Sequence, residues 1–468
     1  MKILRLRMIV PAVLAMLSVP GLAWAGEPTI DTGDTAFIII CSALVMLMTP
    51  GLAFFYGGMV RKKNVLSTIM QSFIVVCLVS VQWVLIGYSL AFGADYGHLI
   101  GSLDWLGLKG VGPDPSDTYG TTLPHYVFAV FQLMFAIITA AIISGSVAER
   151  MRFPAFLAFI LLWTTFIYDP LAHWVWGADG WLLNLGALDF AGGTVVHISS
   201  GVSGLVAAII LGKRKGYGSE AMVPHQLPFT VLGSALLWFG WFGFNAGSAL
   251  AANGLAASAF VVTNTAAAMA ALSWIFAEWL HHGKPTVLGA ASGAIAGLVG
   301  ITPGAGFVTP ISAIAIGLVA GVVCYLGVSV VKRRFGYDDS LDAFGVHGIG
   351  GIWGALATGI FATTAVNEAG KDGLLYGNAA QLGIQAVGVV ATIAFAAVGT
   401  LVVLKLVGVV TKLRATENEE ELGLDLALHG EDAYPDIISG SLIGGKMFGA
   451  MELNTGLGTI KPANNHSS

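Results

Sequence analysis

The chain has 468 residues, of which 56% are hydrophobic and only 10% are charged, and its mean hydropathy is +0.80. Soluble domains carry about 25% charged residues, so this composition excludes an ordinary cytosolic enzyme, a nucleic-acid binder and a disordered protein. The net charge of −5 decides little, because the side of a membrane on which charges lie matters more than their sum. The 62 glycines suit helices that pack closely in lipid. We therefore expect an all-α polytopic membrane protein.

The first residues have the pattern of a secretory signal peptide. Lys2, Arg5 and Arg7 precede a short apolar stretch, and Ala23-Trp24-Ala25 has the form of a cleavage site. This predicts a signal peptide over residues 1–25 and a mature chain that starts at Gly26, on the far side of the membrane. An uncleaved additional span is the alternative, although the apolar stretch is short for one.

Eleven apolar runs follow, each of roughly the 20 residues that cross a bilayer. They lie at 35–60, 67–92, 125–148, 153–171, 193–212, 227–250, 257–280, 286–303, 309–331, 346–364 and 379–411. The connections are short, apart from residues 94–124 and 172–192. We expect one eleven-span domain over residues 35–411.

The positions of Lys and Arg predict the orientation. Loops after even-numbered spans carry only Lys109 and Lys371, whereas loops after odd-numbered spans carry Arg61, Lys62, Lys63, Arg150, Arg152, Lys213, Arg214, Lys215, Lys284, Lys332, Arg333 and Arg334. Cytoplasmic loops are enriched in these residues. The second group is therefore expected in the cytoplasm, with the mature N-terminus in the periplasm and the C-terminus inside. With the signal peptide, this predicts a multi-pass protein of the cell inner (plasma) membrane.

The last part of the chain changes character at Lys412. A charged run from Glu417 to Glu421 is followed by the polar stretch GLDLALHGEDAYPD and a Gly/Ser/Asn-rich end. We expect a cytoplasmic tail over residues 412–468, partly disordered after Asp436.

Two segments of the sequence echo each other. Leu188-Asp189-Phe190 precedes GGTVVHISSG, and Leu341-Asp342-Ala343 precedes FGVHGIGG. Each joins an acidic helix cap to a glycine-rich helix start and a histidine, and the two histidines lie 150 residues apart, in the fifth and tenth spans. Five spans separate the copies, so their orientations in the membrane are opposite. This predicts an inverted five-helix repeat, which in transporters places the substrate route between the repeats.

The histidines of these segments, His197 and His347, lie deep within the expected spans. A single buried histidine is most often a packing residue, but two at equivalent positions of a repeat indicate a shared pore. Neutral imidazoles there can offer polar contacts or a proton relay to a small solute. No HExxH motif or third ligand accompanies them, and the three cysteines show no ligand spacing, so we expect no metal and no cofactor.

Other candidate residues surround the expected pore. Asp189 is placed to cap the helix that starts near Gly192, and its charge also favours cations in a nearby outer vestibule. Aromatic residues are dense near the pore-forming spans, and Ser248 adds a hydroxyl; the aromatic residues are Phe131, Phe135, Trp176, Trp241, Phe242 and Phe244. Any one of them can be an interface anchor, yet a desolvated cation is also held over such rings by about 2 kcal/mol or more.

Long motifs then carry a resemblance from Thr35 to Pro435. They are PGLAFFYGG, RKKNVLS, VAERMRF, GALDFAGGTVVHI, GWFGFNAGS, GAIAGLVGITP and DAFGVHGIGG. With them the sequence resembles the ammonium transporter family (ammonium transporters, methylammonium permeases and Rhesus proteins), specifically its bacterial ammonium-channel branch. The resemblance implies that the protein is not an enzyme. It implies a homotrimer of eleven-span protomers, each with its own narrow hydrophobic pore. The expected substrate is ammonium or ammonia, with methylammonium as an analogue.

Residue roles follow from the same resemblance. Trp176, Phe135 and Ser248 would form the outer recruitment site for ammonium, supported by Asp189. Phe135 and Phe244 would be the gate rings, and the paired imidazoles of His197 and His347 would line the lumen. The remaining two aromatic side chains, Trp241 and Phe131, would line the pore and the vestibule. The tail also resembles the family's cytoplasmic C-terminus, which implies a trimeric PII-type signalling protein as a partner.

Alternatives stay open at this point. One is an ammonium sensor that signals through its tail and whose transport is vestigial. Another is an electroneutral channel for a gas or a small polyol, which the histidine pair alone would permit. The enzyme-class alternative is a membrane enzyme or haem protein with His197 and His347 as ligands. Whether a proton follows the substrate, which would make transport electrogenic, is not encoded in any of these motifs.

Overall fold

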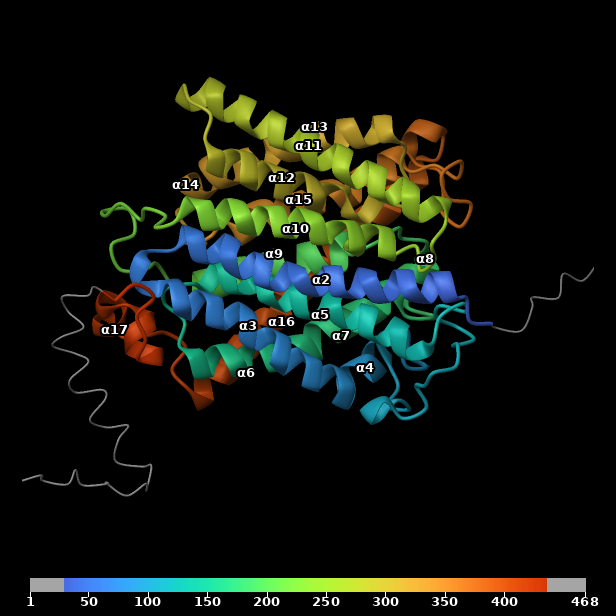
Figure 1. Cartoon of the computed structure of the whole chain (residues 1–468), viewed down its shortest axis with the longest axis horizontal. Helices are drawn as coiled ribbons and strands as arrows, with labels where there is room; N and C mark the ends of the chain where they lie inside the picture. The colour runs from blue at the N-terminus through green and yellow to red at the C-terminus, as the bar shows by residue number, and fades with distance from the viewer. Residues whose placement is uncertain (1–28, 436–468) are drawn as a thin grey trace, which may run out of the picture.

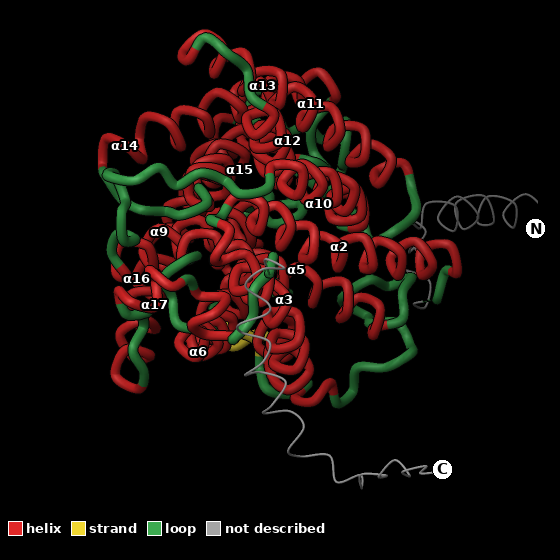
Figure 2. Tube along the Cα trace, turned by 60° about the vertical axis from the view of Figure 1, so that its left-hand side comes forward, coloured by secondary structure: helices red, strands yellow, loops and turns green. Residues whose placement is uncertain are grey.

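The computed structural model describes residues 29–435. The expected signal peptide and the expected disorder after Asp436 lie outside these residues. Within them, eleven helices are long and apolar enough to cross a membrane. Figure 1 shows most of these helices lying side by side along the longest axis of the molecule, and Figure 2 shows from a second side that helix makes up most of the chain. The predicted all-α polytopic fold is confirmed.

The spans are built from α-helices (α) and shorter 3₁₀ or π turns (η). The first five are α2 (Thr32–Met59); η1 (Lys62–Asn64), α3 (Val65–Gln82), η2 (Trp83–Gly87) and α4 (Tyr88–Phe92); α5 (His125–Val147); α6 (Phe153–Trp163), η4 (Thr164–Tyr168), α7 (Asp169–Trp176) and α8 (Trp181–Leu185); and η5 (Gly193–Ile198) with α9 (Ser199–Leu211). The other six are α10 (Leu227–Gly247); α11 (Gly254–His282); α12 (Val287–Ile301) with η6 (Thr302–Gly304); α13 (Pro310–Leu326), η7 (Gly327–Val331) and α14 (Lys332–Phe335); η8 (Phe344–Gly348) with α15 (Ile349–Phe361); and α16 (Ala379–Val410).

The expected spans agree with these helices to within a few residues, except for the fourth. That span was expected to end at residue 171, but α7 continues to Trp176 and α8 follows after a break at Gly177. The polar residues Asp169 and His173 interrupt the apolar run in the sequence, yet both side chains are buried and hydrogen-bonded to neighbouring segments. Pro170 is accommodated because it lies in the first turn of α7, directly after the π turn η4.

The connections define two ends of the bundle. The vestibule end carries residues 93–124, 186–192, 248–253, 305–309 and 362–378, and the tail end carries residues 60–61, 148–152, 212–226, 283–286, 336–343 and 411–435. Short elements decorate both ends: β1 (Asp95–Tyr96) paired antiparallel with β2 (Ile100–Gly101), η3 (Leu106–Leu108) and η9 (Leu374–Tyr376) at the first, α17 (Glu417–Leu422) and η10 (Asp425–His429) at the second. The Lys and Arg residues of the sequence bias therefore lie at the tail end.

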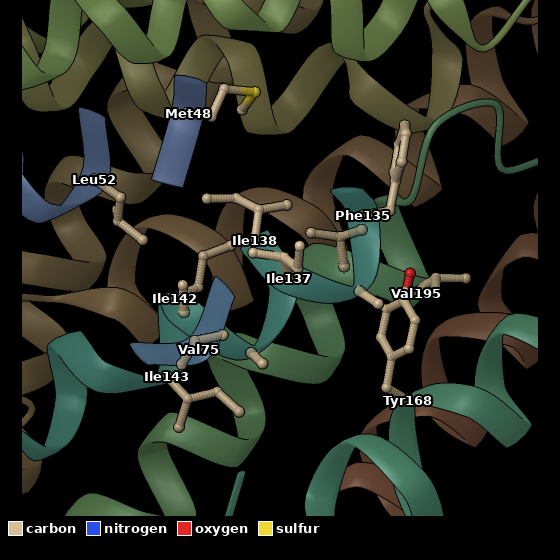
Figure 3. Packing of buried hydrophobic residues seen from close by; sticks show 14 of the residues in the cluster. Met48, Leu52, Val75, Phe135, Ile137, Ile138, Ile142, Ile143, Tyr168 and Val195 are labelled. Atoms are coloured by element: carbon tan, nitrogen blue, oxygen red, sulfur yellow. The ribbon is translucent and has the colours of Figure 1, made fainter. Parts of the chain in front are cut away.

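Helix α5 runs through the interior of the bundle, because nearly all of its side chains are apolar and no polar face directs it to the surface. Figure 3 shows its residues Phe135, Ile138 and Ile142 lying among Met48 of α2 and Val75 of α3. All five of these side chains are almost completely buried. Helix α5 thus forms a fixed wall from which Phe131 and Phe135 project.

The part of the tail that the structure describes is packed against the tail end of the bundle. The Asp425 carboxylate accepts hydrogen bonds from the backbone N–H groups of Leu66 (3.0 Å) and Ser67 (2.7 Å), and so caps the start of α3. Lys63 Nζ donates to the carbonyl oxygens of Glu420 (2.8 Å) and Glu421 (2.6 Å) at the end of α17. Residues 412–435 are therefore an integral layer of the tail end.

A buried ion cluster joins four connections beneath this layer. Arg214 contacts Glu149 at 3.0 Å and Asp338 at 2.8 Å, and Arg61 contacts Glu149 at 2.8 Å. Burial raises the pKa of Glu149, but the guanidinium groups of Arg214 and Arg61 lower it by a larger amount, so its pKa lies below the ordinary range. Burial also raises the pKa of Asp338, but hydrogen bonds from Arg214 lower it by a larger amount, so this pKa too lies below the ordinary range. Both carboxylates are held ionised.

Replacing Arg214 with methionine is expected to lower the free energy of unfolding at pH 7 by about 3–5 kcal/mol, because it leaves the buried Asp338 carboxylate without its partner and leaves Glu149 with Arg61 alone. Lowered folded-state pKa values stabilise the fold above the unfolded carboxyl pKa, near about 4, and this contribution is lost as the pH falls through the folded-state values. The difference in unfolding temperature between wild type and variant should therefore shrink below about pH 4. Lys215→Met, which removes an exposed ion pair with Glu421, is the matched control and should cost far less, because exposed ion pairs contribute little to stability. An equal loss of stability in both variants would contradict this expectation.

Candidate functional site

The two histidines of the sequence repeat meet in the interior of the bundle. His197 lies in η5 and His347 in η8, and both side chains are buried. Their Nδ1 atoms are 3.2 Å apart and their ring centroids 5.3 Å apart. One Nδ1 must donate and the other accept, because a hydrogen bond between two neutral imidazoles needs one of each. His197 Nε2 is buried and has no hydrogen-bond partner among residues 29–435, so it is available to a solute.

Both histidines are held by π turns, which are often found at functional sites. Each π turn begins shortly after an aspartate that accepts its free backbone N–H groups. Asp189 accepts from Gly192 (2.8 Å), Gly193 (2.6 Å) and Thr194 (2.7 Å), and also from the Thr194 hydroxyl. The predicted capping role of Asp189 therefore agrees with the geometry.

The acidic cap of the second copy is a different residue from the one the sequence suggested. Asp339, rather than Asp342, accepts from the N–H of Phe344 at 2.8 Å. Asp342 instead pairs with Lys332 at 2.7 Å. The reason is spacing: His197 follows Asp189 by eight residues, and His347 follows Asp339 by eight. The first cap lies at the vestibule end and the second at the tail end, as an inverted repeat requires.

A column of aromatic rings extends from the histidine pair. The Trp241 ring stacks on His197 with a centroid distance of 5.3 Å and an interplanar angle of 25°, and its Nε1 donates to Thr302 Oγ1 at 2.9 Å. Phe244 lies 6.1 Å from His197 and 4.3 Å from Phe135, measured between centroids. All these side chains are almost completely buried. Phe135 and Phe244 therefore lie in contact with each other between His197 and Trp176.

A cavity of about 300 Å³ lies on the other side of these rings. Trp176, Phe135, Ser248 and Asp189 all line it, so the structure brings together the four residues of the predicted recruitment site. The Trp176 ring meets Phe135 edge-on at 5.8 Å, and its Nε1 donates to the Asp189 carbonyl oxygen at 2.9 Å. Ser248 donates its hydroxyl to the carbonyl oxygen of Phe244 at 2.9 Å, which leaves its oxygen free to accept.

Of the six aromatic candidates, Phe135 and Trp176 line this cavity, Trp241 and Phe244 belong to the column of rings, and Phe131 and Phe242 belong to neither. Phe131 is buried behind Phe135, edge-on at 5.0 Å, and supports that ring from within the bundle. Phe242 stacks on Phe260 at 4.0 Å on a different face of α10. Conversely, the sequence reading missed Gln132, which lines the cavity. Its position three residues before Phe135 on α5 could have indicated this, since residues three apart share a helix face.

A second, smaller cavity of about 180 Å³ lies at the tail end. Val346, the neighbour of His347, lines it together with Glu278, His282, Tyr325 and Asp342. The buried rings and imidazoles therefore separate two cavities at opposite ends of the bundle. Between residues 29 and 435, no group of three or more His, Cys, Asp or Glu side chains is placed to hold a metal ion.

An eleven-helix membrane bundle with two buried histidines and stacked aromatic rings between cavities at its two ends has the features of a multi-pass membrane transport protein. The model of the Ammonium Transporter Family matches residues 36–434. An ammonium transporter of Bacillus subtilis is 61% identical over 404 residues, covering 86% of this chain and 99% of the relative, and one of Aquifex aeolicus is 52% identical over 414 residues, covering 88% and 96%. The chain belongs to the Ammonium Transporter Family, and it is an ammonium transporter.

Solved structures agree with this assignment. Saccharomyces cerevisiae Mep2 superposes with a TM-score of 0.78 at 40% identity, covering 83% of this chain and 91% of that one. A protein described as a sensor Amt protein superposes with a TM-score of 0.77 at 32% identity, covering 84% and 98%. Both similarities extend over most of the bundle.

Proposed function

We propose that this transporter recruits ammonium in the cavity at the vestibule end and conducts ammonia, with net transfer of a proton, along His197 and His347. The observation that carries the proposal is one continuous series of contacts. Trp176, Phe135, Phe244, His197 and His347 follow one another with ring-centroid distances of 5.8, 4.3, 6.1 and 5.3 Å. A solute that leaves the cavity therefore meets the two phenyl rings first and the imidazoles next.

The chemistry of the series suits ammonium. Potassium has nearly the same size and charge, so a size filter alone cannot separate the two ions, whereas ammonium carries four N–H donors and can lose a proton. The faces of Trp176 and Phe135 attract a cation, and Ser248 supplies an acceptor for one N–H group. A charge is costly in the apolar path beyond Phe244, so deprotonation there is favoured. A potassium ion has no such route.

The orientation and assembly are part of the proposal. The Lys and Arg residues of the loops gather at the tail end, which supports placing that end in the cytoplasm and the vestibule end outside. We accordingly propose that the mature N-terminus lies in the periplasm and that the protein resides in the inner membrane. The family resemblance described above implies a homotrimer. We propose this assembly for the present protein, with one substrate path in each protomer.

A rapid ammonium pulse on liposomes that contain the purified protein tests the proposed transport. We expect a transient inward current with the wild type and none with Asp189→Ala or with protein-free liposomes. Absence of current in the wild type, while a trapped pH indicator reports alkalinisation, would replace proton-coupled transport by electroneutral conduction of ammonia. Absence of both signals would favour the second candidate function, an ammonium sensor, which the likeness to a sensor Amt protein supports.

The partner of the tail is proposed to be a PII-type signalling protein. The described tail residues lie at the tail end, beside the loop of residues 212–226. Truncation after Lys412 should abolish retention of a PII trimer on immobilised transporter, because it removes α17 and η10. Truncation after Pro435 should keep it. Retention by both truncated proteins would move the docking surface to the loop from Lys213 to Pro228.

A further inference from the structure

The helix that ends at Trp176, α7, carries a buried histidine that does not belong to the pair of His197 and His347. His173 lies one turn before Trp176 in α7, and its side chain is fully buried. Its Nδ1 is 3.0 Å from the carbonyl oxygen of Ala91, and its Nε2 is 2.9 Å from Oδ1 of Asp95. Ala91 belongs to the end of the second span and Asp95 to β1, so one imidazole connects α7 to two segments far away in sequence.

Both partners of this ring are acceptors. A backbone carbonyl oxygen only accepts, and an ionised carboxylate only accepts. Burial raises the pKa of Asp95, but hydrogen bonds from His173 and from the backbone N–H of His98 lower it by a larger amount, so its pKa lies below the ordinary range. The carboxylate is therefore ionised. The Nε2–H group of His173 therefore donates to this carboxylate. The contact is a charged hydrogen bond, which is stronger than a neutral one.

The bridge lies directly beneath the turn that presents Trp176. The N–H of Gly177 closes this turn on the carbonyl oxygens of Ala172 (3.2 Å) and His173 (3.0 Å). A Cβ atom at Gly177 would lie 2.5 Å from Nδ1 of His173 and 3.0 Å from the carbonyl oxygen of Ala91. The backbone after Trp176 therefore rests on the imidazole with no space between them. A shift of His173 must move this turn.

A second polar contact holds the other end of α7. Gln82 Nε2 donates to Asp169 Oδ2 at 2.7 Å, and Gln82 and Asp169 adjoin the π turns η2 and η4. Helix α7 is thus attached to the second span at both of its ends. The cavity-facing indole of Trp176 is fixed from one side by these attachments and from the other by its hydrogen bond to the Asp189 carbonyl oxygen.

We propose that His173 and Asp95 are positioning residues, which hold Trp176 against Phe135 in the geometry that recruits ammonium. The inference rests on the recruitment role proposed above for Trp176. Loss of the bridge should weaken recruitment and leave the path beyond Phe135 unchanged, because neither residue contacts Phe244 or the histidine pair. The expected effect is therefore on KM and not on the maximal rate.

The test is a double-mutant cycle on reconstituted protein, with KM and maximal rate taken from ammonium-evoked currents. His173→Asn keeps a donor for Ala91 and loses Asp95, whereas Asp95→Asn keeps an acceptor and removes the charge. We expect His173→Asn and Asp95→Ala to raise KM about tenfold, which corresponds to about 1.4 kcal/mol, and Asp95→Asn to raise it less. The maximal rate should change less than about twofold. Asp104→Asn, an exposed carboxylate of the same loop, is the control and should have no effect.

The same variants are then made in a Trp176→Leu background. Residues that act through Trp176 should have no further effect on KM there, whereas independent effects add. Additive effects, or an unchanged KM in His173→Asn and Asp95→Ala, would overturn the positioning role while leaving the proposed function intact. An unchanged KM in Trp176→Leu itself would overturn the recruitment role and the inference with it. Asp95 lies in a loop, so its variants keep the test valid if His173→Asn fails to assemble.

Discussion

Replacement of both His197 and His347 by leucine is expected to lower ammonium-selective flux by at least about 100-fold, the contribution of a positioned proton-transfer group. The two imidazoles are polar groups on the proposed route beyond the phenyl rings, and Nε2 of His197, which has no hydrogen-bond partner among residues 29–435, is the atom best placed to meet a solute. Leucine fills a similar volume, so the stacking surface for Trp241 is lost without a large cavity. The assembly should therefore stay folded.

The measurement is the ammonium-evoked current, together with elution volume in size-exclusion chromatography as a check on folding. His281→Leu is the control, because this histidine hydrogen-bonds Tyr325 at 2.6 Å at the end of α11 and lies outside the path. It should keep wild-type current. The single variant His197→Leu should be impaired as well, since it leaves His347 Nδ1 without its partner. Unchanged flux and selectivity in the double variant would contradict the proposal that His197 and His347 line the substrate path.

Much of the bundle could be predicted because a run of about 20 consecutive apolar residues indicates a membrane span. Runs such as 125–148 and 227–250 contain no interruption, and α5 and α10 begin where these runs begin. The fourth span is the counterexample. Asp169 and His173 look like the end of a span in the sequence, and only the positions of Gln82 and Asp95 reveal that both are satisfied by neighbours.

In the candidate site, too, some features could be predicted from the sequence and others depend on the packing of distant segments. The 150-residue separation of His197 and His347 was visible in the sequence, but their Nδ1 contact depends on two π turns, which have no reliable sequence signal. The sequence predicts Asp342 as the second cap because this residue directly precedes the glycine-rich start, whereas in the structure Asp339, eight residues before His347, accepts from the N–H group of Phe344. Cavity residues from distant segments, such as Gln132, are brought together by packing alone.

Replacement of Asp189 by alanine is expected to abolish the current and to lower the free energy of unfolding by about 3 kcal/mol or more. Hydrogen bonds to a charged group contribute about 1.5–3 kcal/mol each, and this carboxylate accepts from three successive N–H groups within 2.8 Å and from the Thr194 hydroxyl. Without it the first turn of η5 has no cap at a buried helix end. His197, in the same turn, then loses its position against His347.

Two matched variants separate the cap from the charge. Asp189→Asn keeps one acceptor oxygen and removes the charge, so it should recover part of the unfolding free energy but little of the current if the negative charge also favours the cation in the cavity. Asp339→Ala removes the equivalent cap of η8, which accepts a single N–H at 2.8 Å, and should cost less stability than Asp189→Ala. Currents and thermal unfolding midpoints of the three variants, measured side by side, decide between the roles. Full current in Asp189→Asn would show that the cap alone is required, because the amide retains hydrogen bonding and has no charge to attract ammonium.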